Sequence, residues 1–228
     1  MPLRILAMEV SQRTGGLALR CADGRVLVDP LETSTRRGDA LMPAVEHLLR
    51  QAGMCPSDLE ALGISIGPGG FTGLRIGLAV AKVLSWSLKI PVAAVPTALV
   101  AAESDSGDWA RAAVALAGKD DSCWLSIVEG APGDRRLGAG PEGGRLVDSA
   151  GFAAAVSAVD VILADEYLPP VMVPDRPVRT LNFDPRSLLL VTDRFLAEGR
   201  TIDPATLAPI YPRDPEAVRL WDARRPEA

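Results

Sequence analysis

The residues best placed for chemistry are glycines between an apolar strand-like run and an apolar helix-like run. The stretch ISIGPGGFTGLRIGLAVAKVLSW, residues 64–86, carries them at its start. Glycine at such a junction lets a backbone or an anion approach closely, and amide groups at a helix start attract phosphate. The candidate nucleotide or anion loop consists of Gly67, Gly69, Gly70, Thr72 and Arg75.

The same loop also fits a purely structural tight turn. It lacks the Gly-Lys-Ser or Gly-Lys-Thr ending of a nucleoside-triphosphate P-loop, and it lacks the glycine pattern of a dinucleotide fold. Residue types alone therefore favour the turn over the anion site, and both interpretations stay open at this point.

Other catalytic constellations are incomplete. His47 is the sole histidine, so a two-histidine metal site cannot be built, and any Ser-His-Asp or Cys-His arrangement would depend on this one residue. His47 lies within a helical pattern, which favours a solvent-facing side chain. Glu9 ends an apolar strand where kinase-like folds carry a magnesium-binding Asp, and Asp120 with Asp121 is typical of a turn. The sequence predicts no catalytic residue and no metal site.

A face of small residues runs along the helix that follows the loop. Residues four apart share one face of a helix, and glycine inside a helix costs about 0.5 to 1 kcal/mol relative to alanine, so another helix is expected to approach closely there. That neighbour is either internal or a second protein, and the preceding helix is its natural companion. The candidate partner interface comprises Leu41, Val45 and Leu48 on the first helix and Gly73, Gly77 and Ala81 on the second.

Apolar periodicity predicts an α/β protein in two lobes. The order βββαβα is expected for residues 1–104, the N-terminal lobe with the glycine-rich loop and partner-binding helices. Residues 105–228 are expected to form a smaller, divergent C-terminal lobe and tail. Within it, residues 130–145 are dense in Gly, Pro and charge, which predicts a mobile surface loop. The tail from Asp203 is expected to lie over the surface.

Local signals mark several element boundaries. Gly53 is expected to end the first helix, and Ser57 with Glu60 has the spacing of a capping box before the next strand. Asp184, with Pro185 at the first helical position, is expected to begin the last helix.

Composition narrows the class of partner. The chain has 228 residues, a formal net charge of -5 and a pI near 5.0, which argues against direct binding of nucleic acid by its own surface. The three cysteines have no paired metal-ligand spacing and fit reduced thiols. No signal peptide and no apolar run of about 20 residues is recognisable. A cytoplasmic location without membrane contact is expected.

The segment GISIGPGGFTGLRIGLAVAK closely resembles the signature of the TsaB (YeaZ) family, bacterial proteins of tRNA threonylcarbamoyladenosine synthesis. The stretches ILAMEVS, ALMPAVEHLL, IPVAAVPTALVAA and LAPIYPR are similar to other parts of the same family. The resemblance implies the actin, sugar-kinase and Hsp70-like (ASKHA) fold, with two ribonuclease-H-like lobes of which the second is reduced.

The resemblance also implies a function. Family members are noncatalytic scaffold subunits that bind the catalytic subunit TsaD, which the ATPase TsaE joins. The complex transfers a threonylcarbamoyl group to a tRNA adenosine beside the anticodon, so tRNA, ATP or ADP and a metal ion are expected only through the complex, and a homodimer when the chain is alone. The resemblance places the partner surface on the first two helices.

Two alternatives stay open. Glu9 replaces the usual family Asp, and the segment LAGKDDSCWLSIV does not reproduce the Asp-Ala-Arg pattern of many second lobes, which allows a divergent paralogue with a different partner. A stand-alone nucleotide-binding phosphotransferase of the same fold would use Glu9, the Gly67 loop and magnesium.

Overall fold

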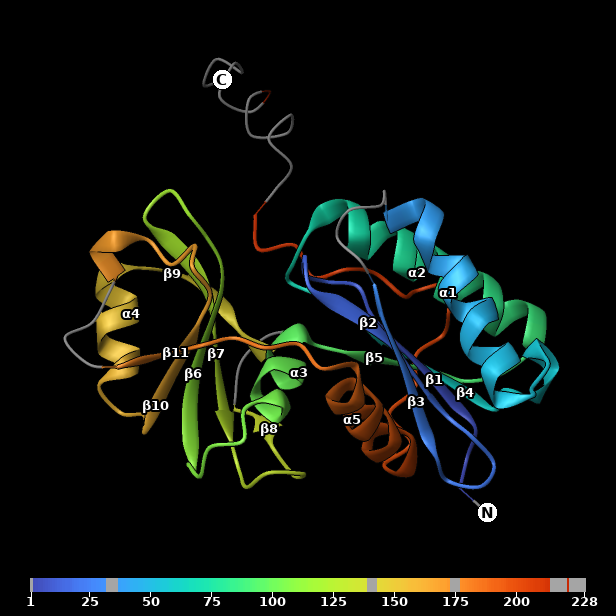
Figure 1. Cartoon of the computed structure of the whole chain (residues 1–228). Helices are drawn as coiled ribbons and strands as arrows, with labels where there is room; N and C mark the ends of the chain where they lie inside the picture. Colours follow the sequence, from blue (N-terminus) through green and yellow to red (C-terminus); the bar gives the residue numbers. More distant parts are fainter. Residues whose placement is uncertain (1, 32–36, 139–142, 173–176, 214–220, 222–228) are drawn as a thin grey trace.

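Two β-sheets with helices on their faces stand side by side in this protein (Figure 1). The computed structural model describes residues 2–31, 37–138, 143–172, 177–213 and 221. The five strands of the first sheet lie in the order β3-β2-β1-β4-β5. Their bounds are β1 Ile5–Glu9, β2 Gly15–Arg20, β3 Val26–Leu31, β4 Ala61–Ser65 and β5 Val92–Val95.

The first sheet mixes two kinds of pairing. β1 pairs antiparallel with β2 and parallel with β4, so the opening meander continues into a parallel crossover. β1 and β4 are buried at every position, as expected of central strands covered on both faces. Helices α1 (Arg37–Ala52) and α2 (Phe71–Leu88) cover one face, and a three-residue 3-10 turn, η1 (Pro56–Asp58), leads into β4.

The second sheet repeats this plan. Its order is β11-β10-β6-β7-β8, with β9 also paired to β7. β6 pairs antiparallel with β7 and parallel with β10, as β1 does with β2 and β4. The bounds are β6 Arg111–Lys119, β7 Ser122–Glu129, β8 Arg136–Leu137, β9 Arg145–Asp148, β10 Val161–Ala164 and β11 Val178–Thr180, with α4 Ser149–Val156 and the 3-10 turn η3 Pro170–Met172.

The repeated topology is that of the ASKHA fold of two ribonuclease-H-like lobes, which the family resemblance implied. The reduction of the second lobe is visible in its outer helix: α4 has 8 residues, whereas α1 and α2 have 16 and 18. The apolar cluster beneath α4 is correspondingly small and includes Phe152, Val156 and Cys123.

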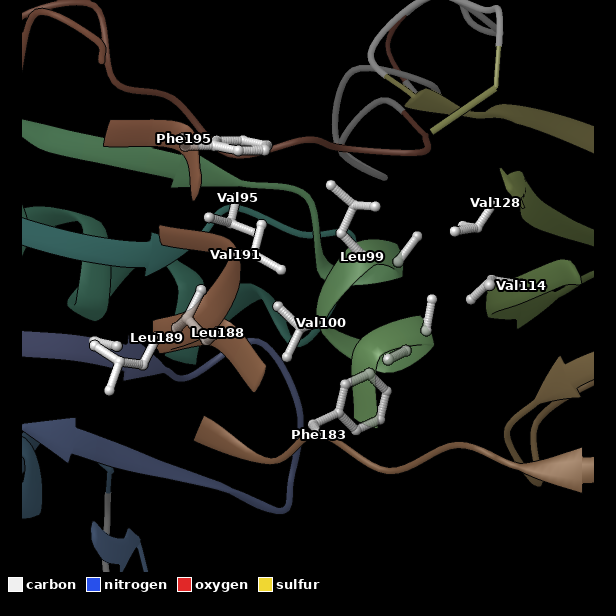
Figure 2. Packing of buried hydrophobic residues seen from close by; sticks show 14 of the residues in the cluster. Val95, Leu99, Val100, Val114, Val128, Phe183, Leu188, Leu189, Val191 and Phe195 are labelled. Atoms are coloured by element: carbon white, nitrogen blue, oxygen red, sulfur yellow. The ribbon is translucent and has the colours of Figure 1, made fainter. Parts of the chain in front are cut away.

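Helices α3 (Thr97–Ser104) and α5 (Pro185–Ala197) pack against each other between the two sheets. Figure 2 shows Leu99 and Val100 of α3 among residues of both lobes, with Leu188 and Val191 of α5 on one side and Val114 on the other. One continuous apolar cluster therefore belongs to both lobes.

The position of α5 differs from the expected division at residue 104. Although α5 comes late in the chain, it packs on β1, β2, β4 and β5 of the first sheet. Its buried stripe, which includes Leu188, Val191 and Phe195, finds its apolar partner surface there. Residues 105–228 thus contribute to both lobes. As the sequence predicted, Asp184 caps α5, accepting a hydrogen bond from the Arg186 amide at 2.8 Å.

Residues of the tail and of one loop are more buried than the sequence predicted. Leu207 and Ile210 of the tail are 2% and 5% exposed, because they complete the apolar surface left open beside β4 and β5. In the loop predicted to be mobile, Arg135 is fully buried, although residues 139–142 lie outside the described part.

The capping pair before β4 is Cys55 with Asp58 rather than Ser57 with Glu60.

Helix α2 has the length and composition of a membrane span, with a mean hydropathy of 1.2 over 18 residues, although no such stretch was expected from the sequence. Its residues Leu74, Leu78 and Ala81 are buried in the apolar cluster on the first sheet. The helix is therefore part of the folded lobe.

A substitution at Gly63 of β4 would test how closely α5 packs on the first sheet. A Cβ atom at Gly63 would lie 1.9 Å from the Thr192 Oγ1 atom and 2.8 Å from its Cβ. We expect Gly63→Ala to lower the free energy of unfolding by about 1 to 3 kcal/mol, the usual cost of overpacking, measured by urea denaturation.

The matched control is Thr192→Ala, which removes the clashing hydroxyl and methyl groups. In the double variant, the cost of Gly63→Ala should be smaller than in the wild-type background, since the two residues are in contact. Additive effects would show that α5 does not approach β4 this closely.

Candidate functional site

The glycine-rich loop between β4 and α2 uses its backbone groups internally. The Gly67 amide donates to the Thr97 Oγ1 atom at 3.1 Å, and the Gly67 carbonyl accepts from the Thr97 amide at 2.9 Å. The Gly70 amide donates to the Ser11 carbonyl at 2.6 Å. These two amides are therefore occupied and do not face an anion.

The glycines instead permit close backbone approaches. A Cβ atom at Gly69 would lie 2.0 Å from the Ser11 carbonyl oxygen, and Gly67 has φ +103°, which disfavours other residues. A Cβ atom at Gly67 would also lie 3.0 Å from the Ile210 carbonyl oxygen. Three segments thus meet at the loop, and the geometry favours the structural turn.

The two side chains predicted to complete an anion site are exposed. Gly70 rather than Thr72 is the N-cap of α2. The Arg75 guanidinium carbon lies 3.6 Å above the Phe71 ring, and its Nε atom donates to the Tyr211 hydroxyl at 3.0 Å. Arg75 is thus positioned by two aromatic residues, while anion binding by this loop stays a prediction.

The groups considered for catalysis have local partners. Glu9 is fully buried, and its Oε1 atom accepts from the Ser11 amide at 2.8 Å and from the Ser11 hydroxyl at 2.5 Å. His47 is exposed, as the sequence predicted, and its Nδ1 atom lies 2.8 Å from the Asp29 Oδ2 atom. Among the described residues, no group of three or more His, Cys, Asp or Glu side chains could hold a metal ion.

The small-residue face of α2 is directed into the chain's own core. Gly73, Gly77 and Ala81 are buried, and a Cβ atom at Gly77 would lie 2.3 Å from Cγ2 of Val10. On α1, the three candidate interface leucine and valine residues are at most 2% exposed, and these are Leu41, Val45 and Leu48.

This corrects the residue assignment of the partner interface. The close neighbour of Gly77 is the chain's own sheet, through Val10 directly after β1 and Ile64 of β4, and not the second helix that the sequence predicted. A partner of α1 and α2 has to contact their outer faces.

The outer face of α2 carries an apolar stripe. Ile76 is half-buried, Ala79 is exposed, and Val83 and Trp86 are 59% and 56% exposed. Their spacing of three, four and three residues is that of a helix-packing seam. The same spacing can be recognised in the sequence, on the face of the helix opposite to the glycines.

Figure 1 shows α1 beside α2 on the same outer layer of the first lobe. Met42 of α1 is 39% exposed. Exposed large apolar residues that gather on neighbouring helices mark interaction sites more often than single scattered ones do. We call Ile76, Ala79, Val83 and Trp86 the α2 stripe.

A buried arginine network joins the second lobe to α3. Arg135 donates to the carbonyl groups of Ala102, Asp105 and Gly107, and its guanidinium carbon lies 3.8 Å above the Trp109 ring. Burial lowers the pKa of Arg135, while nearby carboxylates oppose that shift. The sequence predicted a mobile loop here, because the acceptors that bury Arg135 lie about thirty residues earlier in the chain and leave no local pattern.

Glu103 connects this network to α5. Its side chain accepts from the backbone amides of Gly133 and Arg135 at 2.8 and 3.0 Å, and from the Arg194 guanidinium at 3.1 Å. The Glu103 and Arg194 side chains are 3% and 12% exposed. Such a buried pair holds orientation well, because its hydrogen-bond geometry is specific.

Comparisons with known proteins point in one direction. Residues 28–126 match the family model described as TsaD, tRNA N6-adenosine threonylcarbamoyltransferase. The chain is 40% identical over 93 residues to the tRNA threonylcarbamoyladenosine biosynthesis protein TsaB of Bacillus subtilis, and 30% identical over 109 residues to that of Escherichia coli. The alignments cover 41% and 48% of this chain and 41% and 46% of those proteins, so the chain matches less than half the length of either.

The structural similarity extends further. YeaZ from Pseudomonas aeruginosa superposes with a TM-score of 0.78 at 25% sequence identity, and the match covers 92% of this chain and 100% of that one. Both lobes are therefore shared, although sequence similarity is concentrated in part of the chain.

Substitutions at Gly77 separate a core position from a surface position. We expect Gly77→Ala to destabilise the fold despite the better helix propensity of alanine, because its methyl group would overlap with Val10. Gly77→Leu should abolish cooperative unfolding, measured by circular dichroism during heating.

Ala79→Leu is the control, at an exposed position of the same helix. It should leave the melting temperature nearly unchanged. A Gly77→Leu chain as stable as the Ala79→Leu chain would contradict the burial of this face.

Proposed function

We propose that the chain is a member of the TsaB (YeaZ) family and a noncatalytic scaffold subunit of tRNA threonylcarbamoyladenosine synthesis. In this proposal, it binds and activates a TsaD-type catalytic subunit, which transfers the threonylcarbamoyl group to the tRNA adenosine beside the anticodon. The α2 stripe is the main observation that supports the proposal, because the exposed apolar side chains of this helix would be buried by packing against a helix of a partner.

The stripe has the composition of a protein interface. Trp86 is 56% exposed, and tryptophan is among the residues that contribute most to binding when a partner buries them. Val83 lies one helical turn before it and adds apolar area. Arg75 and Phe71 extend the surface toward the start of the helix, where they pack on each other. Aromatic and arginine side chains are enriched at interfaces.

The remaining partners follow from the same role. We propose that a TsaE-type ATPase joins the complex, and that the chain forms a homodimer through the same helices when TsaD is absent. The acidic pI near 5.0 supports contact with tRNA only through the complex. ATP or ADP and a metal ion would be held in the partner complex, in the cytoplasm, and this chain would supply no cofactor site of its own.

Val83→Glu tests the partner surface. A carboxylate at this position would be buried without a counter-charge in the complex, so we expect affinity for the TsaD homologue of the same organism to fall about 30-fold or more. The measurement is co-expression followed by size exclusion with light scattering, with affinity measured by calorimetry.

Val171→Glu is the matched control. Val171 is 58% exposed, against 59% for Val83, but it lies in the second lobe. The control should bind TsaD normally, and both variants should retain the wild-type melting temperature. Equal binding by both would contradict the α2 surface.

The same preparation tests the role itself. Failure of the folded wild-type chain to bind TsaD would indicate a divergent paralogue with another partner. ATP turnover by the purified chain alone, lost in Glu9→Gln, would indicate a phosphotransferase instead of a scaffold.

A further inference from the structure

After α5, the chain returns to the first lobe and becomes part of it. The Ile202 amide donates to the Val92 carbonyl at 3.0 Å, and Leu207 enters the apolar cluster shared with α1 and α2. The Ile210 amide then donates to the Ile66 carbonyl at 2.8 Å. Residues up to Ile210 are therefore attached to the edge of β5 and the end of β4.

Tyr211 is held at the start of α2. Its hydroxyl accepts a hydrogen bond from Arg75 at 3.0 Å, and its ring centroid lies 5.5 Å from that of Phe71. The absence of a side chain at Gly67 leaves room for the Ile210 carbonyl. Ile210 and Tyr211 are thus bound to the first lobe by the glycine loop and the first turn of α2.

Arg213, two residues further, binds the second lobe. Its Nη1 atom donates to the Ala117 carbonyl at 2.9 Å. Its Nη2 atom lies 2.8 Å from the Lys119 carbonyl, 3.0 Å from the Ser122 carbonyl and 2.6 Å from the Ser122 hydroxyl. The planar guanidinium suits such a converging set of acceptors better than a lysine ammonium would.

The shape of the β6–β7 turn provides those acceptors. Ala117, Asp120 and Asp121 all have positive φ angles, of 53°, 50° and 54°. Within this turn, the carbonyl groups of Ala117, Lys119 and Ser122 accept hydrogen bonds from Arg213. A second contact crosses the lobes nearby, where the Arg13 guanidinium carbon lies 5.4 Å from the Tyr167 ring centroid.

We propose that residues 210–213 form a strap that fixes the two lobes relative to each other. Ile210 and Tyr211 are seated on the first lobe and Arg213 on the second. Three residues span at most about 10 Å when fully extended, so the glycine loop cannot move away from the β6–β7 turn while both ends are bound. Figure 1 shows the end of the described chain passing between the lobes, on the side away from α5.

The strap acts at a place that the shared core does not reach. α3 and α5 join the lobes through apolar packing, whereas the strap uses charge-assisted hydrogen bonds to backbone carbonyls. The two connections together prevent the opening motion that hinged two-lobe proteins undergo. This inference concerns the chain alone and stands independently of its partner in tRNA modification.

Arg213→Ala tests the strap through hydrogen exchange of the full chain. Without the guanidinium, backbone amides in residues 116–124 should exchange about tenfold faster or more, as expected for the loss of charge-assisted hydrogen bonds. Amides of α4 should be unaffected. Arg200→Ala is the matched control, because Arg200 lies in the same C-terminal part but pairs with Glu198 and stacks on Phe195.

A distance measurement reports the lobes directly. Spin labels at exposed Cys55 in the first lobe and at Ala153→Cys on α4 would give the interlobe distance, since Cys21 and Cys123 are buried. We expect one narrow distribution for the parent and the Arg200→Ala chain, and a broader one for Arg213→Ala.

Unchanged exchange and an unchanged distance distribution in Arg213→Ala would overturn the proposal. Arg213→Lys serves if the alanine variant does not fold, since it retains the charge but loses the planar fork. It should shift both readouts in the same direction by a smaller amount, and a lysine chain identical to the parent would also overturn the strap.

Discussion

The structure depends on one constraint: two sheets have to share a single pair of helices. α3 and α5 lie between the sheets, and the strands facing them carry small residues such as Ala7, Ala18, Ala61 and Ala112. Small side chains on the strands let the helices approach, and the larger Leu and Phe side chains of the helices fill the space between. The lobes therefore cannot be separated without exposing a common core, which makes the chain one folding unit in spite of its duplicated topology.

Polar contacts close the two sides of this core. On one side, Glu103 and Arg194 tie α3 to α5, while Arg135 brings the β7–β8 loop onto the end of α3. Truncating Arg135 would leave the carbonyl groups of Ala102 and Gly107 without this donor, so the network is sensitive to loss of any member. The opposite side is closed by Arg213. Arginine holds both sides because one guanidinium can satisfy several backbone acceptors at once.

Local patterning was sufficient to predict most elements of the first lobe. The apolar runs around β1 and β4, Gly53 as a positive-φ residue after α1, and Asp184 as the cap of α5 all depend on neighbours in sequence. The loop with Arg135 and the tail with Leu207 were placed wrongly, because their burial depends on surfaces far along the chain. A charged, glycine-rich composition describes the unfolded segment well, but it does not show which acceptors the folded protein presents.

The candidate site illustrates the same limit at one helix. The sequence predicted a small-residue face on α2 and a second helix packed closely against it. A close neighbour is present, but it is the sheet and not a helix, because the local sequence does not encode which element packs there. Val10 of the chain itself occupies that position, which leaves the α2 stripe as the face that is free to meet a partner. The first turn of α2 has a further task, since Phe71 and Arg75 hold Tyr211. One helix thus packs the core with its inner face, presents Val83 and Trp86 outward, and seats the C-terminal segment at its start. The effect of a substitution in α2 therefore depends on the face that carries it: inner positions affect stability, the α2 stripe affects partner binding, and the first turn affects the position of Tyr211.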